Sequence, residues 1–264
     1  MSLSLPVFYC FPRSGGTLLN QCLLCSKSTV VLSEVNPAGS FLAIERQAGE
    51  WFGLITEKEV GQLGARTYLE KIALVARRCR DRQQQLCIRD WVAINFIPKL
   101  TPLAPACSGT LEQRAYLRAA GYDLREIVLL RRSGEVLHSL RKHMPGFTDY
   151  PLDRFAGQYR AFLRAVEGCP KFYLEEFTRD PDAVLRRICA ALSLEFPPGF
   201  ATEFHGQTHV TGNTTLQKPP PSATSARITS LPRSARPRER LPAGSRDVLA
   251  ALDALAGYPP EARE

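Results

Sequence analysis

The sequence lacks several features that would assign it to a familiar class at once. No apolar run approaches the ~20 residues that a membrane-spanning helix needs, so we do not expect a membrane protein. The first residues carry neither a basic segment nor a long apolar stretch, which argues against a secretory signal. The eight cysteines are spread from Cys10 to Cys189 rather than densely packed, which excludes a small disulfide scaffold. We therefore expect a soluble, cytoplasmic protein with reduced thiols.

A metal-binding pattern is also missing. Cys22 and Cys25 form a single Cys-x-x-Cys pair, and no second pair of cysteines stands at the spacing of a metal site. We therefore assign both thiols to the core and expect no metal site. With 264 residues, 44% of them hydrophobic, the chain can bury a sizeable core as a single domain over residues 1–264. The formal net charge of +8 suits an anionic ligand. It would equally suit binding to nucleic acid, or it could simply reflect the six arginines that lie between Arg227 and Arg246.

What the sequence does contain is an alternation of strand and helix patterns. Short apolar runs predict five strands, at residues 5–11, 29–32, 86–88, 126–130 and 171–174. Apolar residues at helical spacing predict helices between them, including one long helix over residues 57–82 and others over 110–120, 152–166 and 247–255. Strands separated by helices imply a parallel sheet covered on both faces. The expected fold is therefore α/β and P-loop-like, with three layers and a central parallel sheet of about five strands.

Two segments interrupt this alternation. Residues 92–124, which hold three prolines between Pro98 and Gly109, could form a cap insertion. In residues 205–246 the periodicity fades, and Lys218 to Gly244 holds six prolines and many arginines. A disordered basic linker is one interpretation of this composition. Because a helical pattern returns at residues 247–255, we favour a basic lid that closes over an anionic cofactor.

The stretch that points to chemistry runs from Phe8 to Leu19. It predicts a strand, a glycine turn and the start of a helix, whose unpaired N–H groups and positive dipole end attract an anion. The glycines let the backbone approach a ligand closely, and the arginine and hydroxyls of the turn add side-chain donors. The sequence therefore predicts a phosphate or sulfate site here. Its expected binding residues are Arg13, Ser14, Gly15, Gly16, Thr17 and Leu18.

Charged residues also follow the other predicted strands. Ligands of open parallel sheets bind beyond the carboxyl ends of the strands, and Arg13, Glu34, Asp90 and Arg131 fall at such ends. They are therefore candidates for one site. Glu34 is either a polar strand end or a general base, and only geometry can decide between the two. Asp90 is either a helix cap or the alternative base.

Two motifs in this chain resemble those of the sulfotransferase family. The segment Phe11–Leu19 looks like the family's 5′-phosphosulfate loop. The segment Leu129–Ser139 is similar to its 3′-phosphate motif, in which an arginine after a strand is followed eight positions later by a serine on the next helix, as in Arg131 and Ser139. A third segment, Glu175–Leu185, resembles the family's sequence after the fifth strand.

The resemblance implies transfer of a sulfuryl group from 3′-phosphoadenosine 5′-phosphosulfate (PAPS) to a hydroxyl or amine of a small molecule or glycan. It implies that Arg13 stabilises the leaving oxygen, that Gly15–Leu18 cradles the 5′-phosphate, and that Arg131 and Ser139 bind the 3′-phosphate. The position of Glu34 resembles that of the base in members that use a glutamate.

The chain also departs from the family pattern in two places. Leu174 stands where soluble members often have a tyrosine, and the late Arg-Lys-Gly motif of the family is not visible. The acceptor cannot be read from the sequence. Nothing specifies a role for the four histidines, which are His138, His143, His205 and His209.

Two other function classes stay open. A nucleotide kinase or NTPase of related fold is disfavoured because the loop lacks the Gly-Lys-[Ser/Thr] ending that binds phosphates and magnesium. A non-catalytic nucleotide or RNA binder would suit the basic charge. No aromatic residue, however, interleaves with the arginines between Arg227 and Arg246 as base stacking requires, so nucleic acid is disfavoured.

Overall fold

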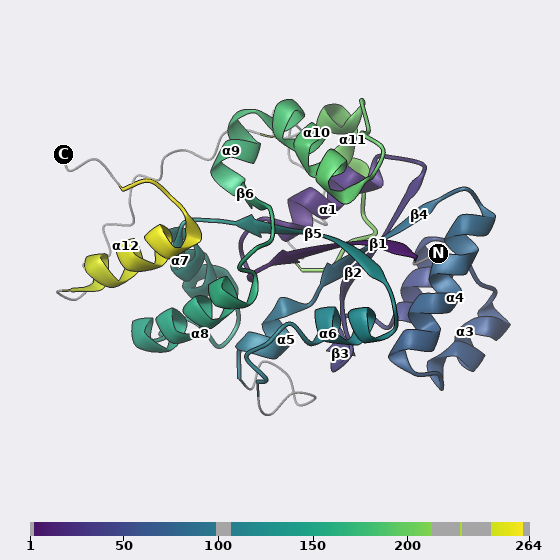
Figure 1. Ribbon diagram of the computed structural model, residues 1–264, viewed down its shortest axis with the longest axis horizontal. Helices are drawn as coiled ribbons and strands as arrows, with labels where there is room; N and C mark the ends of the chain where they lie inside the picture. Colours follow the sequence, from purple (N-terminus) through teal and green to yellow (C-terminus); the bar gives the residue numbers. More distant parts are fainter. Residues whose placement is uncertain (1–2, 99–106, 213–227, 229–243, 261–264) are drawn as a thin grey trace.

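The computed structural model describes residues 3–98, 107–212, 228 and 244–260, and its centre is a six-stranded sheet of order β3-β2-β4-β1-β5-β6 (Figure 1). The strands are β1 (Ser4–Cys10), β2 (Thr29–Asn36), β3 (Gly39–Ser40), β4 (Gln85–Asp90), β5 (Asp123–Leu130) and β6 (Lys171–Tyr173). All pair in parallel except β3, a two-residue strand antiparallel to β2. This confirms the predicted α/β fold with a parallel sheet of five strands, to which the short β3 is added.

The central strand β1 is apolar and buried on both faces from Leu5 to Cys10. Val7 and Tyr9 belong to one hydrophobic cluster, whereas Phe8 and Cys10 belong to the other, on the opposite face. A strand buried on both sides has no polar face, which is why the sequence shows a continuous apolar run rather than an alternation.

Helices cover both faces of the sheet, as predicted, and form the two outer layers (Figure 1). The face that contains Phe8 is covered by α1 (Gly16–Leu24), α9 (Leu174–Arg179), α10 (Pro181–Leu192), α11 (Phe200–Glu203) and the 3-10 turn η2 (Phe204–Gly206). The face that contains Val7 is covered by α2 (Ile44–Arg46), the π-helical turn η1 (Gln47–Trp51), α3 (Glu57–Gly64), α4 (Tyr68–Asp81), α5 (Val92–Phe96), α6 (Glu112–Ala119), α7 (Ser133–His143), α8 (Leu152–Ala165) and α12 (Ser245–Ala256).

The prediction of one long helix over residues 57–82 was wrong, since α3 and α4 are separate helices. Thr67 caps the start of α4: its hydroxyl accepts from the Glu70 N–H at 3.4 Å, and the Glu70 carboxylate accepts from the Thr67 N–H at 2.8 Å. The same capping box joins Thr56 and Glu59 at the start of α3. A threonine three residues before a glutamate is a helix-start signal, and it stands twice in this stretch.

The second strand is longer than the sequence pattern predicts. Pairing of β2 with β4 shifts register between Leu32 and Val35, and Glu34 adopts a left-handed φ of 51°. Ser33 and Glu34 therefore lie in a bulge within the strand, rather than beyond its end. Helix α9, which follows β6 directly, was also not predicted.

The predicted cap and lid segments are described only in part. Helices α5 and α6, from the cap segment, contribute Val92, Phe96 and Leu117 to the cluster around Val7. Residues 99–106 of the cap, and residues 213–227 and 229–243 of the lid, lie outside the described residues. The single-domain interpretation, the cap and the lid thus stay predictions.

Two expectations drawn from composition can be compared with the structure. All eight cysteines are free thiols. Among the described residues, no helix combines the length and apolar character needed to cross a bilayer. The cytoplasmic location stays a prediction.

Candidate active site

The turn between β1 and α1 has the backbone geometry of an anion-binding loop. Arg13 and Gly15 adopt left-handed φ angles of 71° and 90°, and the Ser14 N–H donates to the Phe11 carbonyl at 3.1 Å. Helix α1 begins at Gly16, so the N–H groups of its first turn have no acceptor within the helix. These groups are therefore available to an oxyanion at the helix start.

Close packing explains both glycines of the loop. A Cβ at Gly15 would lie 2.5 Å from Cδ1 of Leu174, and one at Gly16 would lie 2.3 Å from Sγ of Cys10. Both distances are shorter than real Cβ contacts, so a larger residue at either position would displace the neighbouring side chain, and the left-handed φ of Gly15 adds backbone strain there. Leu174 thus packs directly on the loop.

Two donors around the loop lack an acceptor in the described parts of the chain. The Ser14 hydroxyl is fully buried without a hydrogen-bond partner, and so is the Nε atom of Arg131. A buried donor left unpaired costs about 1–3 kcal/mol. A phosphate or sulfate group held at the loop is the kind of acceptor that these donors lack, so the residues present fit such a group.

The second predicted motif lies against the first. Arg13 Nε donates to Ser139 Oγ at 3.0 Å, and Arg131 Nη1 donates to the Arg13 carbonyl at 3.1 Å. Arg131 also pairs with Glu135 at 3.3 Å. Burial, together with the nearby charge of Arg131, lowers the pKa of Arg13. Two adjacent guanidinium groups with one carboxylate leave an excess of positive charge at this point.

The turn that follows β5 is held by the C-terminal part of the chain. The Ser133 N–H, at the start of α7, donates to Asp253 Oδ1 at 2.7 Å, and the Arg132 N–H donates to Glu175 Oε1 at 3.0 Å. The Arg132 guanidinium lies 3.4 Å from Asp253 and over the ring of Tyr258. Arg132 is therefore engaged with α12 and with Tyr258, two residues beyond its end. Sequence reasoning did not find Asp253 or Tyr258, because neither is near the motif in the chain.

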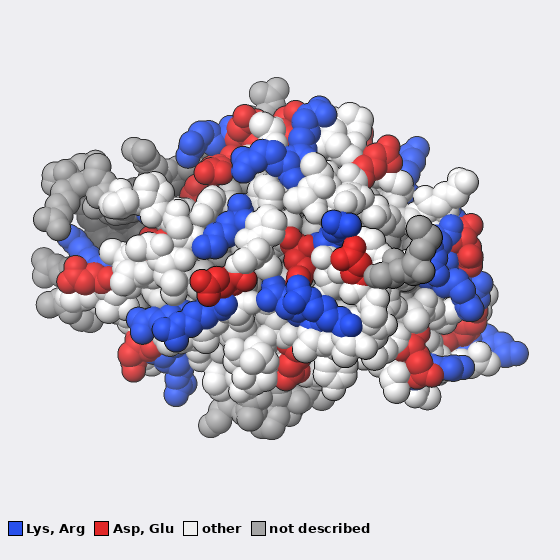
Figure 2. Space-filling model, viewed as in Figure 1, with Lys and Arg blue, Asp and Glu red and all other residues white. Residues whose placement is uncertain are grey.

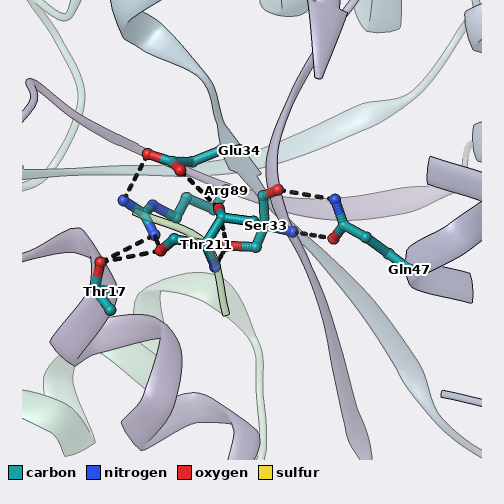
Figure 3. Close-up of polar contacts among 6 residues, drawn as sticks. All are labelled: Thr17, Ser33, Glu34, Gln47, Arg89 and Thr211. Atoms are coloured by element: carbon teal, nitrogen blue, oxygen red, sulfur yellow. Dashed lines mark hydrogen bonds and ion pairs between the residues drawn. The ribbon is translucent and has the colours of Figure 1, made fainter. Parts of the chain in front are cut away.

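Glu34 is tied to the loop by a buried polar network (Figure 3). Its Oε1 accepts from Arg89 Nη2 at 2.9 Å, and its Oε2 accepts from the Thr211 hydroxyl at 2.6 Å. Arg89 Nη1 donates to the Thr211 carbonyl at 3.1 Å and to Thr17 Oγ1 at 3.4 Å, and Thr17 Oγ1 donates to the same carbonyl at 3.2 Å. The network thus joins the carboxylate to the first turn of α1.

Arg89 is the main residue of this site that sequence reasoning left unassigned. Its side chain is 7% exposed, and a Cβ at Gly16 would lie 3.0 Å from its Nε, so it packs directly behind the loop. A buried guanidinium requires partners, and an arginine within the apolar run of β4 is the signal that could have identified it.

Asp90, the alternative base, is not part of this network. Strand alternation turns it toward the face of Ile88, whereas Arg89 turns toward α1. Asp90 Oδ1 accepts from Asn36 Nδ2 at 2.8 Å, and the same nitrogen donates to Asn95 Oδ1 at 2.8 Å. Burial raises the pKa of Asp90 to about 7. The four predicted strand-end residues therefore do not share one site. Arg13, Glu34 and Arg131 lie around the loop, whereas Asp90 lies on the opposite face of the sheet.

The histidines have no common location. His209 stacks on Trp51 with ring centroids 5.8 Å apart, and His205 lies in η2. His143 lies near the end of α7, where the slight burial of its ring and the charge of Arg13 lower its pKa. Among the described residues, no group of three or more acidic, cysteine or histidine side chains is arranged to hold a metal ion.

Comparisons with known proteins give a likeness in structure but none in sequence. No protein-family model matches the chain, and no curated protein matches it. The sulfotransferase domain from the Synechococcus PCC 7002 olefin synthase aligns at a TM-score of 0.66 with 20% identity, over 98% of this chain and 96% of its own. The sulfotransferase domain from the curacin biosynthetic pathway aligns at 0.65 with 14% identity, over 98% of this chain and 99% of its own. Because both alignments extend over nearly the whole chain, this protein has the fold of sulfotransferase domains.

Proposed function

We propose that this protein is a sulfotransferase that moves a sulfuryl group from PAPS to a hydroxyl or amine acceptor by in-line transfer. The observation that carries the proposal is the joining of the two predicted phosphate motifs, through the bond from Arg13 to Ser139 and the bond from Arg131 to the Arg13 carbonyl. One anion loop alone suits many phosphate ligands. Two anion sites in contact suit a nucleotide that carries phosphate groups at both its 5′ and 3′ positions.

The two motifs divide the binding of such a nucleotide. The first turn of α1 and the Ser14 hydroxyl would hold the 5′-phosphosulfate, since they offer donors without acceptors. Arg131, whose Nε has no acceptor among the described residues, and Ser139 would hold the 3′-phosphate. Charge-assisted bonds from a guanidinium to a phosphate are among the stronger hydrogen bonds in proteins, so this second site should contribute much of the selectivity.

The chemistry then needs a proton acceptor and a group that stabilises the leaving oxygen. When bound, PAPS supplies a sulfuryl group attached to a phosphate leaving group. Arg13 would stabilise the negative charge that develops on the leaving oxygen, as a planar donor fork. Glu34 would accept the proton of the acceptor, and its contacts with Arg89 and Thr211 orient its carboxylate. As in phosphoryl transfer, most of the catalysis would come from positioning and electrostatic stabilisation.

Two competing functions are less well supported. A kinase or NTPase would need the P-loop lysine on the phosphates, and Arg13 is the only cationic residue in the stretch Phe8–Leu19. A non-catalytic RNA binder would use a broad basic surface. On the face drawn in Figure 2, Lys and Arg side chains are instead interspersed with Asp and Glu. The two sulfotransferase domains of like fold also favour the transferase.

The proposal is tested by ligand binding and by transfer. We expect adenosine 3′,5′-bisphosphate to raise the melting temperature in a concentration-dependent way without added metal, since a ligand that binds only the folded state stabilises it. Incubation with ³⁵S-labelled PAPS and pooled alcohols, phenols and amines should yield a labelled acceptor. Equal stabilisation by ATP with magnesium, and none by the bisphosphate, would support the kinase instead. Binding of the bisphosphate without transfer to any pool would support a non-catalytic binder.

A further inference from the structure

The side chain of Gln47 pairs with the backbone of the residue that precedes the candidate base. Gln47 is fully buried at the start of η1. Its Oε1 accepts from the Ser33 N–H at 2.7 Å, and its Nε2 donates to the Ser33 carbonyl at 2.9 Å (Figure 3). A further bond from Nε2 reaches the Leu42 carbonyl at 2.7 Å. All the hydrogen-bonding groups of this amide are thus engaged with main-chain atoms.

This pairing occurs where β2 loses its regular register. A neighbouring strand would offer one acceptor and one donor to Ser33, and the Gln47 amide offers the same pair from a side chain. The bulge between Leu32 and Val35 needs such support, because the left-handed conformation of Glu34 is unfavourable for a residue other than glycine. Bulges re-aim side chains next to active sites, and π-helical turns such as η1 are frequent at functional sites.

The bulge sets the direction in which the Glu34 side chain leaves the strand. From this backbone position it reaches Arg89 and the Thr211 hydroxyl, and the Ser33 side chain adds a second tie, since its Oγ accepts from the Thr211 N–H at 3.1 Å. Within the part of the chain that the structure describes, the hydrogen bonds of the Gln47 side chain go to Ser33 and Leu42 and not to Arg89, Thr211 or the loop. It can act on the site only through the main chain of β2.

We propose that Gln47 is a positioning residue, which sets the orientation of Glu34 and thereby the rate of sulfuryl transfer without contributing to nucleotide binding. The inference rests on the proposed function, in which Glu34 is the base. A carboxylate displaced by about 1 Å can cost on the order of a hundredfold in rate. The effect should therefore fall on turnover rather than on affinity for the donor.

The test compares Gln47→Met, which keeps the length of the side chain but none of its three hydrogen bonds, with Gln113→Leu as a matched control. Gln113 is also a fully buried glutamine, but its carbonyl accepts from the Tyr68 hydroxyl, on a different part of the fold. Transfer from ³⁵S-labelled PAPS to the pooled alcohols, phenols and amines measures turnover. Calorimetric titration with adenosine 3′,5′-bisphosphate measures donor-site affinity.

We expect Gln47→Met to lower turnover by roughly ten- to a hundredfold while the affinity for the bisphosphate stays within about twofold. Gln113→Leu should lower the melting temperature and leave turnover within a few-fold of wild type. In the Glu34→Gln background, Gln47→Met should cause no additional loss, because the group that it positions is already gone. Losses that multiply in the double variant, or that affect affinity and turnover alike, would overturn the proposal.

A second variant covers the case in which Gln47→Met does not fold. Gln47→Glu can reproduce the paired bonds to Ser33 only when its carboxyl is protonated, so its turnover relative to wild type should rise as the pH is lowered. If the turnover of Gln47→Glu is close to that of wild type at every pH, the result would contradict the proposal.

The structural part of the inference is judged separately from the reaction. If the wild type transfers nothing to any acceptor pool, the proposed function fails. A crystal structure of either variant then decides the positioning claim on its own. A Glu34 carboxylate released from Arg89 and Thr211 would support the claim, and an unmoved carboxylate would reject it.

Discussion

Arg13 and Ser139 lie 126 positions apart in the sequence, and Arg13 Nε donates a hydrogen bond to Ser139 Oγ at 3.0 Å. The bond connects the glycine loop after β1 with the middle of α7. Because β1 and β5 are neighbouring parallel strands, the segments that follow them meet at the same edge of the sheet. Each motif is short, and their contact creates a site that neither forms alone.

The first prediction concerns the 3′-phosphate. Hydrogen bonds to charged groups contribute about 1.5–3 kcal/mol each. Wild type should therefore bind PAPS roughly ten- to a thousandfold more tightly than adenosine 5′-phosphosulfate, which lacks the 3′-phosphate. Arg131→Ala should remove most of this preference and barely change affinity for adenosine 5′-phosphosulfate. Calorimetric titration of both proteins with both nucleotides measures the two affinities.

The alternative role for Arg131 is structural, through its ion pair with Glu135. In that case Arg131→Ala would lower the melting temperature, and the preference for the 3′-phosphate would survive in the folded protein. Glu135→Gln serves as the control, because it breaks the ion pair and keeps the guanidinium. An unchanged preference in Arg131→Ala ends the assignment.

The second prediction assigns the base. Glu34→Gln keeps the size of the side chain and removes its ability to accept a proton, so turnover should fall by roughly a hundred- to ten-thousandfold. Affinity for adenosine 3′,5′-bisphosphate should stay close to wild type. If Glu34→Gln turns over normally while Asp90→Asn is inactive, the base is Asp90, and the acceptor would have to approach the opposite face of the sheet.

The third prediction tests the packing of the loop. A methyl group at Gly16 would meet Cys10 and Arg89, so Gly16→Ala should destabilise the fold by about 1–3 kcal/mol and abolish binding of the bisphosphate. Gly157→Ala, in the middle of α8, meets nothing within 4 Å and should stabilise the protein by about 0.5–1 kcal/mol. Urea denaturation of the two variants measures both changes. Normal binding by Gly16→Ala would contradict the close packing described for the loop.

The fourth prediction concerns pH and stability. Burial raises the pKa of Asp90 to about 7, against a usual value of 3.8, and the hydrogen bond from Asn36 offsets this only in part. Below pH 4 the carboxyl is protonated in both states. Between pH 4 and pH 7 it ionises in the unfolded chain first, so stability is lost as the pH rises. At about 1.4 kcal/mol per pH step, the loss has an upper limit of about 4 kcal/mol.

The measurement is the free energy of unfolding in urea at pH 5, 6, 7 and 8, for wild type and for Asp90→Asn. The asparagine has no charge to bury. The free energy of unfolding of wild type, relative to that of Asp90→Asn, should therefore fall as the pH rises to about 7 and then become constant. A difference that does not change with pH would mean that Asp90 ionises normally in the folded protein.

Local features of this site could be predicted from the sequence, whereas long-range ones could not. The loop and the eight-residue spacing from Arg131 to Ser139 are each written in one short stretch. Arg89 and Thr211 join Glu34 from segments far apart in the chain, so no spacing reveals them. The roles assigned to these residues stay predictions until the variants are measured.

The same distinction applies to the fold. The apolar runs identified the five parallel strands, because β1, β2 and β4 are buried almost throughout and the second half of β5 is buried too. The bulge at Ser33 and Glu34 was not predicted, because it is supported by the side-chain amide of Gln47, which lies outside the strand. The division of residues 57–82 into two helices was missed for another reason, because the apolar stripe continues past the capping threonine at Thr67.

Asp253 binds the first N–H group of the helix that carries Ser139, and Ser133 donates its hydroxyl to the Leu249 carbonyl in return. The order of synthesis gives this contact a consequence. A ribosome makes the glycine loop first and α7 later, but the support for α7 is made only with α12, which follows both. The growing chain therefore braces the start of α7 only after all six described strands of the sheet have been made.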